Sequence, residues 1–223
     1  MEKIILIETS TALCSVALAE NGAITAYRES SAAKAHASLT AVFVQEVLQE
    51  RGLKLEDCDA VCVSMGPGSY TGLRVGVSTA KGLCFGSGKP LIAAGTLDTL
   101  VAQAECGTRY IVPMIDARRM EVYSAVFEDG RQITETSPAI IDESSFAEYL
   151  EQGPVLFIGD GAGKCADVIK HPNAQFCQCH PKASAMLAPA LKAYKEKRFE
   201  DVAYFEPFYL KEFVATVSKK KLF

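Results

Sequence analysis

The sequence predicts an α/β protein built from two related lobes, each with the element order β-β-β-α-β-α. An apolar strand ends in an acidic residue twice, at Glu8 and at Asp116, and each is followed by a turn dipeptide, Asn21-Gly22 and Asp129-Gly130. Both features recur at the same spacing of 108 residues. Asn-Gly and Asp-Gly are the strongest short signals of a β-hairpin. A mixed sheet with helices on its faces is the expected packing of each lobe.

In the first lobe, the apolar run that begins at Ile4 predicts a strand that ends at Glu8. The turn dipeptide then joins a strand that begins at Ser15 to a third strand over Ala23–Arg28. A helix is expected to open at Ser69 or Thr71, because both are suitable N-caps. The remaining elements are a helix over Lys34–Arg51, a strand over Ala60–Met65, the glycine turn Gly66-Pro67-Gly68, and the end of the helix that follows it near Phe85.

The second lobe repeats this order in a shorter form. Its expected elements are a strand that ends at Asp116, strands over Tyr123–Phe127 and Arg131–Thr136, a helix over Ser144–Glu151, a strand over Val155–Ile158, and the glycine turn Gly159-Asp160-Gly161, which leads into a helix. The two glycine turns are 93 residues apart, so the second lobe has lost 15 residues, mostly from its helix. We expect lobes over residues 1–107 and 108–204, with a boundary near Cys106–Arg109. Residues 205–223 lie outside the repeat and are a candidate to pack back on the first lobe.

The composition is that of a folded, weakly acidic chain. Its 223 residues include 23 Lys and Arg against 27 Asp and Glu, and the net charge of −4 gives little attraction to a nucleic-acid backbone. The first apolar run is too short for a signal peptide, and no run approaches the ~20 apolar residues of a membrane span. We therefore expect a cytoplasmic protein with free cysteines and no membrane partner. The cluster Cys177-Gln178-Cys179-His180 lacks a second ligand pair at zinc spacing, so no metal is expected there.

Each lobe offers a strand end and a glycine turn of the kind that binds a metal–phosphate group. A glycine turn that opens a helix presents unpaired N–H groups to an anion. The candidate nucleotide-site residues are Glu8, Ser10, Gly66, Gly68, Asp116, Arg118, Gly159 and Gly161. The repeat resembles the actin/hexokinase/Hsp70 ATPase superfold, whose members usually carry Asp-x-Gly in each lobe. This chain has Glu8-Thr9-Ser10 and Asp116-Ala117-Arg118 instead. We therefore expect a vestigial site, and the alternative is that each glycine turn only links a strand to a helix.

Two helices of the first lobe have the patterns of a subunit interface. In the helix after the glycine turn, small residues recur every four positions and permit the close approach of another helix. The preceding helix has two apolar stripes, although one is enough to cover a core. The predicted partner interface consists of Leu39, Phe43, Val47, Gly72, Arg74, Gly76 and Ala80. The alternative is that the small residues pack inside their own lobe.

Four sequence runs carry a closer resemblance. They are Ile7–Ser10, Gly66–Arg74, Asp116–Tyr123 and Pro207–Lys211. Together they resemble the TsaB (YeaZ) family, bacterial proteins of the system that makes threonylcarbamoyladenosine in tRNA. The resemblance spans essentially the whole chain. Two positions depart mildly from it, because Glu8 stands where Asp is usual and Lys211 where Arg is usual.

The resemblance implies a subunit that is not catalytic by itself. TsaB is a shortened paralogue of the catalytic subunit TsaD, which holds its metal through two histidines four residues apart on a helix. At that place this chain reads Thr96-Leu97-Asp98-Thr99-Leu100, and its histidines, at 36, 171 and 180, have no such spacing. The resemblance implies a scaffold that pairs with a TsaD-like subunit through the first-lobe helices and engages a TsaE-like ATPase. It also implies a homodimer when the chain is alone, tRNA contact only through the complex, and no tightly bound cofactor, with ATP or ADP at the complex interface left open.

Two other functions compete with this interpretation. The glycine turns are also typical of a free-standing phosphotransferase or ATPase of the same superfold. Relatives were once labelled glycoproteases, but the sequence shows no Ser–His–Asp or zinc-ligand set. The basic run Lys219-Lys220-Lys221 is interpreted as a solvated tail rather than a tRNA clamp.

Overall fold

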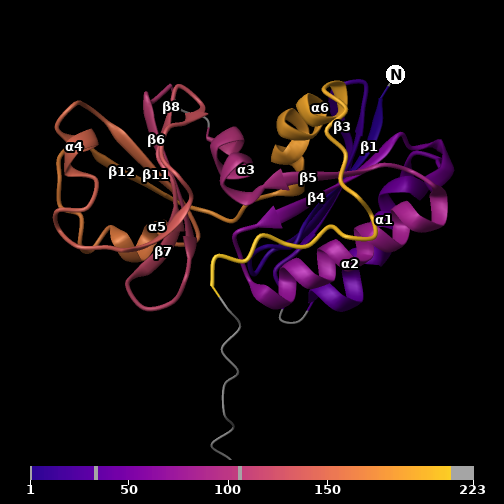
Figure 1. Cartoon of the computed structure of the whole chain (residues 1–223), viewed down its shortest axis with the longest axis horizontal. Coiled ribbons are helices and arrows are strands. Elements are labelled where there is room, and N and C mark those ends of the chain that lie inside the picture. The colour runs from indigo at the N-terminus through magenta and orange to yellow at the C-terminus, as the bar shows by residue number, and fades with distance from the viewer. Residues whose placement is uncertain (1, 33–34, 105–106, 212–223) are drawn as a thin grey trace, which may run out of the picture.

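The computed structural model describes residues 2–32, 35–104 and 107–211. Figure 1 shows two sheets side by side, each with helices on its faces. The first lobe contains β1 (Lys3–Glu8), β2 (Cys14–Glu20), β3 (Ala23–Ser30), α1 (Ala35–Glu50), η1 (Leu55–Asp57), β4 (Ala60–Gly66), α2 (Tyr70–Ser87), β5 (Leu91–Gly95) and α3 (Thr96–Gln103). The second part contains β6 (Tyr110–Asp116), β7 (Glu121–Ser124), β8 (Phe127–Glu128), β9 (Arg131–Gln132), β10 (Ser137–Ile140), α4 (Ala147–Leu150), β11 (Val155–Gly159), α5 (Ala162–Cys165), β12 (Ala174–Gln178), η2 (Ala183–Met186) and α6 (Leu187–Lys195).

The two sheets have matching topologies. The first has the order β3-β2-β1-β4-β5, and the main path of the second is β10-β7-β6-β11-β12. In each, the strand that ends in the acidic residue is central, antiparallel to the following strand and parallel to the strand before the glycine turn. The duplication expected from the sequence is therefore confirmed. The structure adds one parallel strand to each sheet, β5 and β12, that the expected order β-β-β-α-β-α did not contain.

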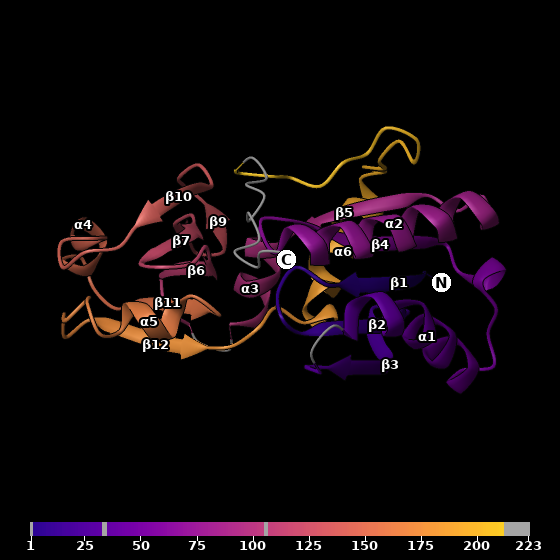
Figure 2. The same ribbon diagram turned by 90° about the horizontal axis from the view of Figure 1, so that it is seen from below.

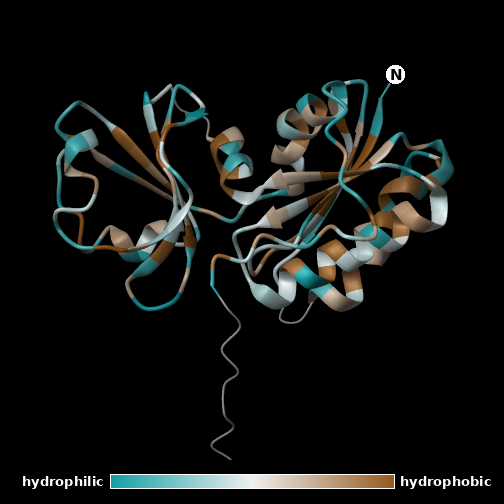
Figure 3. Ribbon diagram, in the orientation of Figure 1, coloured by the Kyte–Doolittle hydropathy of each residue, from teal (hydrophilic) through white to brown (hydrophobic). Residues whose placement is uncertain are grey.

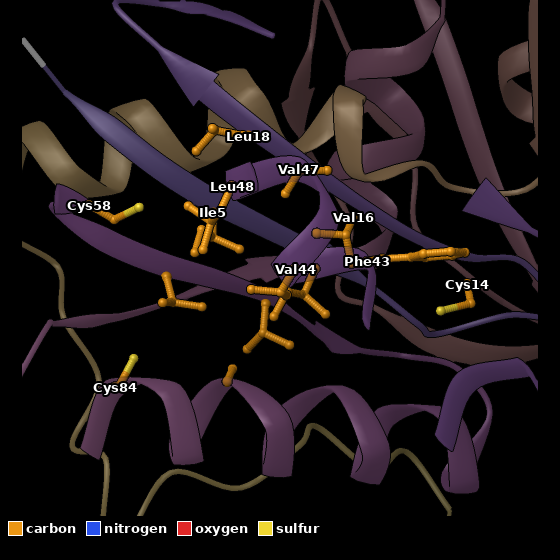
Figure 4. Packing of buried hydrophobic residues seen from close by; sticks show 14 of the residues in the cluster. Ile5, Cys14, Val16, Leu18, Phe43, Val44, Val47, Leu48, Cys58 and Cys84 are labelled. Atoms are coloured by element: carbon orange, nitrogen blue, oxygen red, sulfur yellow. The ribbon is translucent and has the colours of Figure 1, made fainter. Parts of the chain in front are cut away.

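Strand β1 is buried on both faces because helices cover both sides of the first sheet. Ile5 and Ile7 pack with α1 and α2, whereas Ile4 and Leu6 pack with η2 and α6, as the two-residue side-chain period of a strand requires. Figure 4 shows the first of these layers, with Phe43 and Val47 of α1 directed toward the sheet. In Figure 3 hydrophobic residues gather in the central strands of both sheets, and hydrophilic residues gather in the connecting loops.

Helices α1 and α2 and the strand between them lie within a few residues of their predicted ranges. Ser69 is the N-cap of α2, and its side chain accepts a hydrogen bond from the Gly72 N–H at 3.3 Å. Both hairpin dipeptides have positive φ angles at both positions, as a type I′ turn requires. Local sequence signals thus determine most of the first lobe. Figure 2 shows α1 and α2 lying over the first sheet.

The second lobe departs from its expected elements at three places. The strand expected over Arg131–Thr136 is reduced to β9, and the strand that pairs with β7 is β10, which begins after the expected range. The strand expected over Tyr123–Phe127 is divided into β7 and β8, and both pair with β6. Pro113 of β6 has no N–H to donate across this gap, and the N–H of Val126 instead donates to Thr134 Oγ1 at 2.8 Å. The helix expected over Ser144–Glu151 is reduced to α4, the four residues Ala147–Leu150.

The two lobes exchange their last helices. Leu97 and Leu100 of α3 pack against the second sheet, with Ile111 and Leu156 among their neighbours. Residues of η2 and α6 instead complete the core on the outer face of the first sheet. The expectation that the C-terminal lobe continues to residue 204 is therefore wrong from Ala183 onward. The cause is apolar packing of η2 and α6 on the first sheet, and a comparison of the two repeats in the sequence does not show contacts between lobes.

The described part of the C-terminal segment, residues 205–211, lies against the first lobe, where the Phe208 N–H donates to the Met65 carbonyl at 2.7 Å. Residues 212–223, including the Lys219-Lys220-Lys221 run, are outside the described residues, as are Lys34 and Cys106. Within the described ranges, no helix is long and apolar enough to cross a membrane.

Candidate functional site

A cavity of about 610 Å³ lies between the two lobes. The turns after β1, β4 and β6 and the C-terminal segment supply most of its wall. Of the eight predicted nucleotide-site residues, four line the cavity, namely Ser10, Gly68, Asp116 and Arg118. The other four, Glu8, Gly66, Gly159 and Gly161, are not among the residues that line it.

Glu8 is completely buried at the end of β1. Its Oε1 accepts a hydrogen bond from the backbone N–H of Ser10 at 2.7 Å, and its Oε2 has no partner among the described residues. Burial raises the pKa of the Glu8 carboxyl, and hydrogen bonds from Ser10 and Ser64 oppose that rise only in part. The carboxylate is therefore held inward by its own turn rather than presented to the cavity.

The glycines of the first-lobe turn allow backbone to pack on backbone. A Cβ on Gly68 would stand 2.4 Å from the Ser10 carbonyl oxygen, to which the Ser69 N–H also donates at 2.6 Å. Gly66, with φ of +114°, is similarly close to the carbonyl oxygen of Phe208. These contacts explain the glycines at both positions by close backbone packing within the chain.

Asp116 at the end of β6 is held by a cation of its own lobe. Lys164 Nζ donates to Asp116 Oδ1 at 2.5 Å, to the Arg119 carbonyl at 2.7 Å and to the Glu121 carbonyl at 2.6 Å. All three ammonium donors are thus used. The backbone of Arg118 lies in the left-handed region at φ 70°, and its backbone N–H donates to the same carboxylate at 2.8 Å. Both of these hydrogen bonds to the carboxylate end on Oδ1, and 44% of the Asp116 side chain stays exposed.

The N–H and carbonyl groups of the second glycine turn also form hydrogen bonds within the chain. Gln178 Oε1 accepts the Gly163 N–H at 2.6 Å, and Asp160 Oδ1 accepts the Asp116 N–H at 2.9 Å. Burial raises the pKa of Asp160. A Cβ on Gly159 would lie 2.2 Å from the Met114 carbonyl oxygen, so the turn packs directly on β6. These contacts are what is expected of a glycine turn that only links strand β11 to helix α5.

The structure favours the packing alternative for most of the predicted partner interface. Phe43, Val47 and Ala80 are buried in the core of their own lobe, and Leu39 packs partly buried against it. Gly72 and Gly76 face Thr9, and a Cβ on Gly72 would lie 2.1 Å from the Thr9 carbonyl oxygen. Among the predicted residues Arg74 is exposed, and its guanidinium lies 4.3 Å above the Tyr70 ring. The expectation that the small residues contact a partner is therefore wrong, because they let α2 approach the turn after β1.

A different face of the same helices is open to solvent. It consists of the exposed residues Ala37, Ala41, Val42, Ser78, Gly82 and Phe85, which we call the α1–α2 face. Phe85 is 87% exposed, and Phe85 and Gly82 line a pocket together with the charged residues Lys81 and Asp201. Sequence reasoning missed Phe85, although its place on α2 opposite the buried stripe was a usable signal. It also missed the contributions of Tyr70, Lys164 and Tyr209 around the cavity.

Among the described residues, no group of three or more His, Cys, Asp or Glu side chains is placed to hold a metal. Cys177 is exposed, and burial raises the pKa of Cys179 to about 12. At the position where the resemblance implies metal-binding histidines, Thr96, Leu97, Thr99 and Leu100 of α3 are buried apolar or hydroxyl side chains.

Comparisons with known proteins agree with the sequence pattern. A family model described as TsaD, tRNA N6-adenosine threonylcarbamoyltransferase, matches residues 29–219. The TsaB protein of Escherichia coli K12, named for tRNA threonylcarbamoyladenosine biosynthesis, is 32% identical over 96% of both chains. The chain belongs to the TsaB family. A TsaB of Haemophilus influenzae is 30% identical over 98% of this chain and 96% of its own length.

Solved structures support the TsaB assignment. YeaZ from Pseudomonas aeruginosa has a TM-score of 0.82 and 27% identity, over 94% of this chain and all of its own. A second Pseudomonas aeruginosa structure, described as similar to peptidase YEAZ, has a TM-score of 0.85 and 26% identity, over 95% of this chain and all of its own. A dehydratase activator from Clostridium difficile with bound ADPNP has a TM-score of 0.51 at 12% identity, over 88% of this chain and 96% of its own, which shows the shared fold alone. This TsaB-family chain therefore shares its two-lobe fold with the YeaZ structures and, at the level of the fold alone, with the dehydratase activator.

Proposed function

We propose that this chain takes part in tRNA threonylcarbamoyladenosine biosynthesis as a non-catalytic scaffold that binds and supports a TsaD-like catalytic subunit. One observation carries the proposal. The cavity between the lobes is present, but Asp116, which lines it, is paired with Lys164 of the same chain, and Glu8, which does not line it, is turned inward to the Ser10 N–H. The names of the TsaB relatives support the pathway.

The α1–α2 face supports the partner contact. Interface cores are depleted in charged residues and enriched in aromatic ones. Phe85 stands out from this face as a large apolar side chain that is 87% exposed, and Val42 is an exposed apolar side chain of α1. We propose that this face, rather than the buried glycine stripe, contacts the TsaD-like subunit, and contacts a second copy when the chain is alone. The TsaE-like ATPase, and tRNA contact only through the complex, remain part of this proposal.

Shared ancestry with the catalytic subunit supports the same partner. The tRNA N6-adenosine threonylcarbamoyltransferase of Jannaschia sp. is 46% identical to this chain over 66 residues, which are 30% of this chain and 18% of that protein.

The test is a modification assay reconstituted with the other components. We expect product to be lost when this chain is omitted. Phe85→Ser should weaken association with the TsaD-like subunit, whereas Ile140→Ser should not, since Ile140 is similarly exposed at 77% but lies on β10 of the second lobe. Undiminished product without the chain contradicts the proposal.

The alternative function is a free-standing phosphotransferase or ATPase, for which the cavity of about 610 Å³ would be the binding site. Calorimetry of the isolated chain with Mg-ATP separates the two functions. Tight, magnesium-dependent binding with turnover would support the enzyme. Weak binding without turnover supports the scaffold, in which ATP or ADP binds only at the interface of the complex.

A further inference from the structure

The C-terminal segment 200–211 is held against the first lobe along much of its length, although it forms almost no regular secondary structure. The Glu200 N–H donates to the Leu91 carbonyl at 2.9 Å. Lys81 Nζ, on α2, donates to backbone carbonyls of the segment, including that of Phe205 at 3.0 Å. In Figure 1 this yellow segment crosses the first lobe and ends between the two lobes.

The last described residues are fixed to the first-lobe glycine turn. The Phe208 N–H donates to the Met65 carbonyl at 2.7 Å, and a Cβ on Gly66 would lie only 2.7 Å from the Phe208 carbonyl oxygen. The ring of Tyr209 packs on that of Tyr70 with centroids 4.7 Å apart. The backbone of the segment is therefore seated directly on the turn.

Lys211 then contacts the second lobe. Its ammonium forms an ion pair with the Glu121 carboxylate and lies 6.0 Å from the centre of the Tyr123 ring. The backbone carbonyl of Glu121 accepts a hydrogen bond from Lys164, the residue that also holds Asp116. Residues 208–211 all line the interlobe cavity. They thus connect the glycine turn of one lobe to the acidic turn of the other.

We propose that residues 208–211 form a clasp that joins the two lobes and limits how far the interlobe cavity opens. The clasp has a strong half and a weak half. Its first-lobe half rests on a backbone hydrogen bond and an aromatic contact, whereas its second-lobe half rests on one ion pair. That pair is partly exposed, with side-chain exposures of 43% for Lys211 and 22% for Glu121. Exposed ion pairs are weak and are screened by salt, so the clasp releases first at Lys211, and the loss of that contact lets Phe208 leave the glycine turn more often. This inference does not depend on the proposed scaffold function.

Hydrogen exchange of the full chain, followed by mass spectrometry, tests the clasp. Lys211→Ala should speed exchange in peptides covering 117–123 and 208–211 by roughly two- to fivefold, the range expected for loss of one exposed pair. Lys211→Arg should retain the wild-type rates, and the charge swap Lys211→Glu with Glu121→Lys should restore them. Added salt should speed exchange in the wild type but not in Lys211→Ala.

The matched control is Arg28→Ala, which removes ion pairs to Glu46 and Glu50 at 2.9 and 2.8 Å within the first lobe. It should leave both peptides unchanged. Wild-type exchange rates in both peptides of Lys211→Ala would overturn the clasp. Failure of the charge swap to restore protection would also overturn it, because the single variants would then act through something other than the pair.

Discussion

Gly72→Ala tests whether the small residues of α2 serve the fold or a partner. A Cβ at Gly72 would stand 2.1 Å from the Thr9 carbonyl oxygen, more than an ångström inside ordinary contact, which begins near 3.4 Å. The obstacle is backbone, so no side-chain rotation relieves it. Overpacking of this kind costs about 1–3 kcal/mol, whereas the gain in helix propensity from glycine to alanine is at most about 1 kcal/mol. We expect a net loss of about 1–2 kcal/mol of stability.

Gly82→Ala on the same helix is the matched comparison. Nothing lies within 4 Å of a Cβ at Gly82, so the propensity gain should stand alone and raise stability by up to about 1 kcal/mol. Urea unfolding followed by circular dichroism gives both midpoints. At about 2–4 °C per kcal/mol for a chain of this size, thermal unfolding should show the same opposite signs. A Gly72→Ala variant as stable as the wild type would refute the packing argument and reopen the partner interpretation of the stripe.

Three further predictions follow from the sites described. Lys164→Met should lower the free energy of unfolding by about 1–3 kcal/mol, because Asp116 and two backbone carbonyls lose a charged donor. An unchanged midpoint in urea unfolding would show that these three hydrogen bonds do not stabilise the fold. Glu8 has a raised folded-state pKa, so its favourable contribution is complete below its ordinary pKa of 4.5 and is lost as pH rises through the folded-state value. Glu8→Gln should therefore gain stability over the wild type progressively as the pH rises above 4.5, and parallel profiles would show that Glu8 is not the titrating group. Phe85→Ser should weaken association by about fivefold or more, the loss of at least about 1 kcal/mol typical of an aromatic anchor, with no change in unfolding; equal sedimentation of variant and wild-type complexes would exclude Phe85 from the interface.

Local sequence signals accounted for the elements whose stability is local. The N-cap at Ser69 and the positive φ angles of both hairpin dipeptides depend on residues a few positions apart, which a sequence displays directly. The break between β7 and β8 lies opposite Pro113, which is visible in the sequence but belongs to the neighbouring strand β6. It could be predicted only after the strand pairing was known.

The candidate site was less predictable than the fold. Of the eight residues that the sequence assigned to a nucleotide site, Ser10, Gly68, Asp116 and Arg118 line one cavity and the other four do not. It could not show that Lys164, 48 positions after Asp116, would neutralise that carboxylate, because the ion pair exists only when α5 packs behind β6. It also could not separate packing from binding for the α2 glycines, since both functions need the same small residues.

The sequence alone determined the duplication, the strand and turn chemistry of each lobe and the membership in the TsaB family, because these follow from residue types at short or repeated spacings. Only the tertiary structure decided the exchange of α3 and α6 between lobes, the inward orientation of the glycine stripe and the clasp from Phe208 to Lys211. Each of these depends on which surfaces meet after the chain has folded, and a linear pattern does not specify a contact between residues as distant as Lys211 and Glu121.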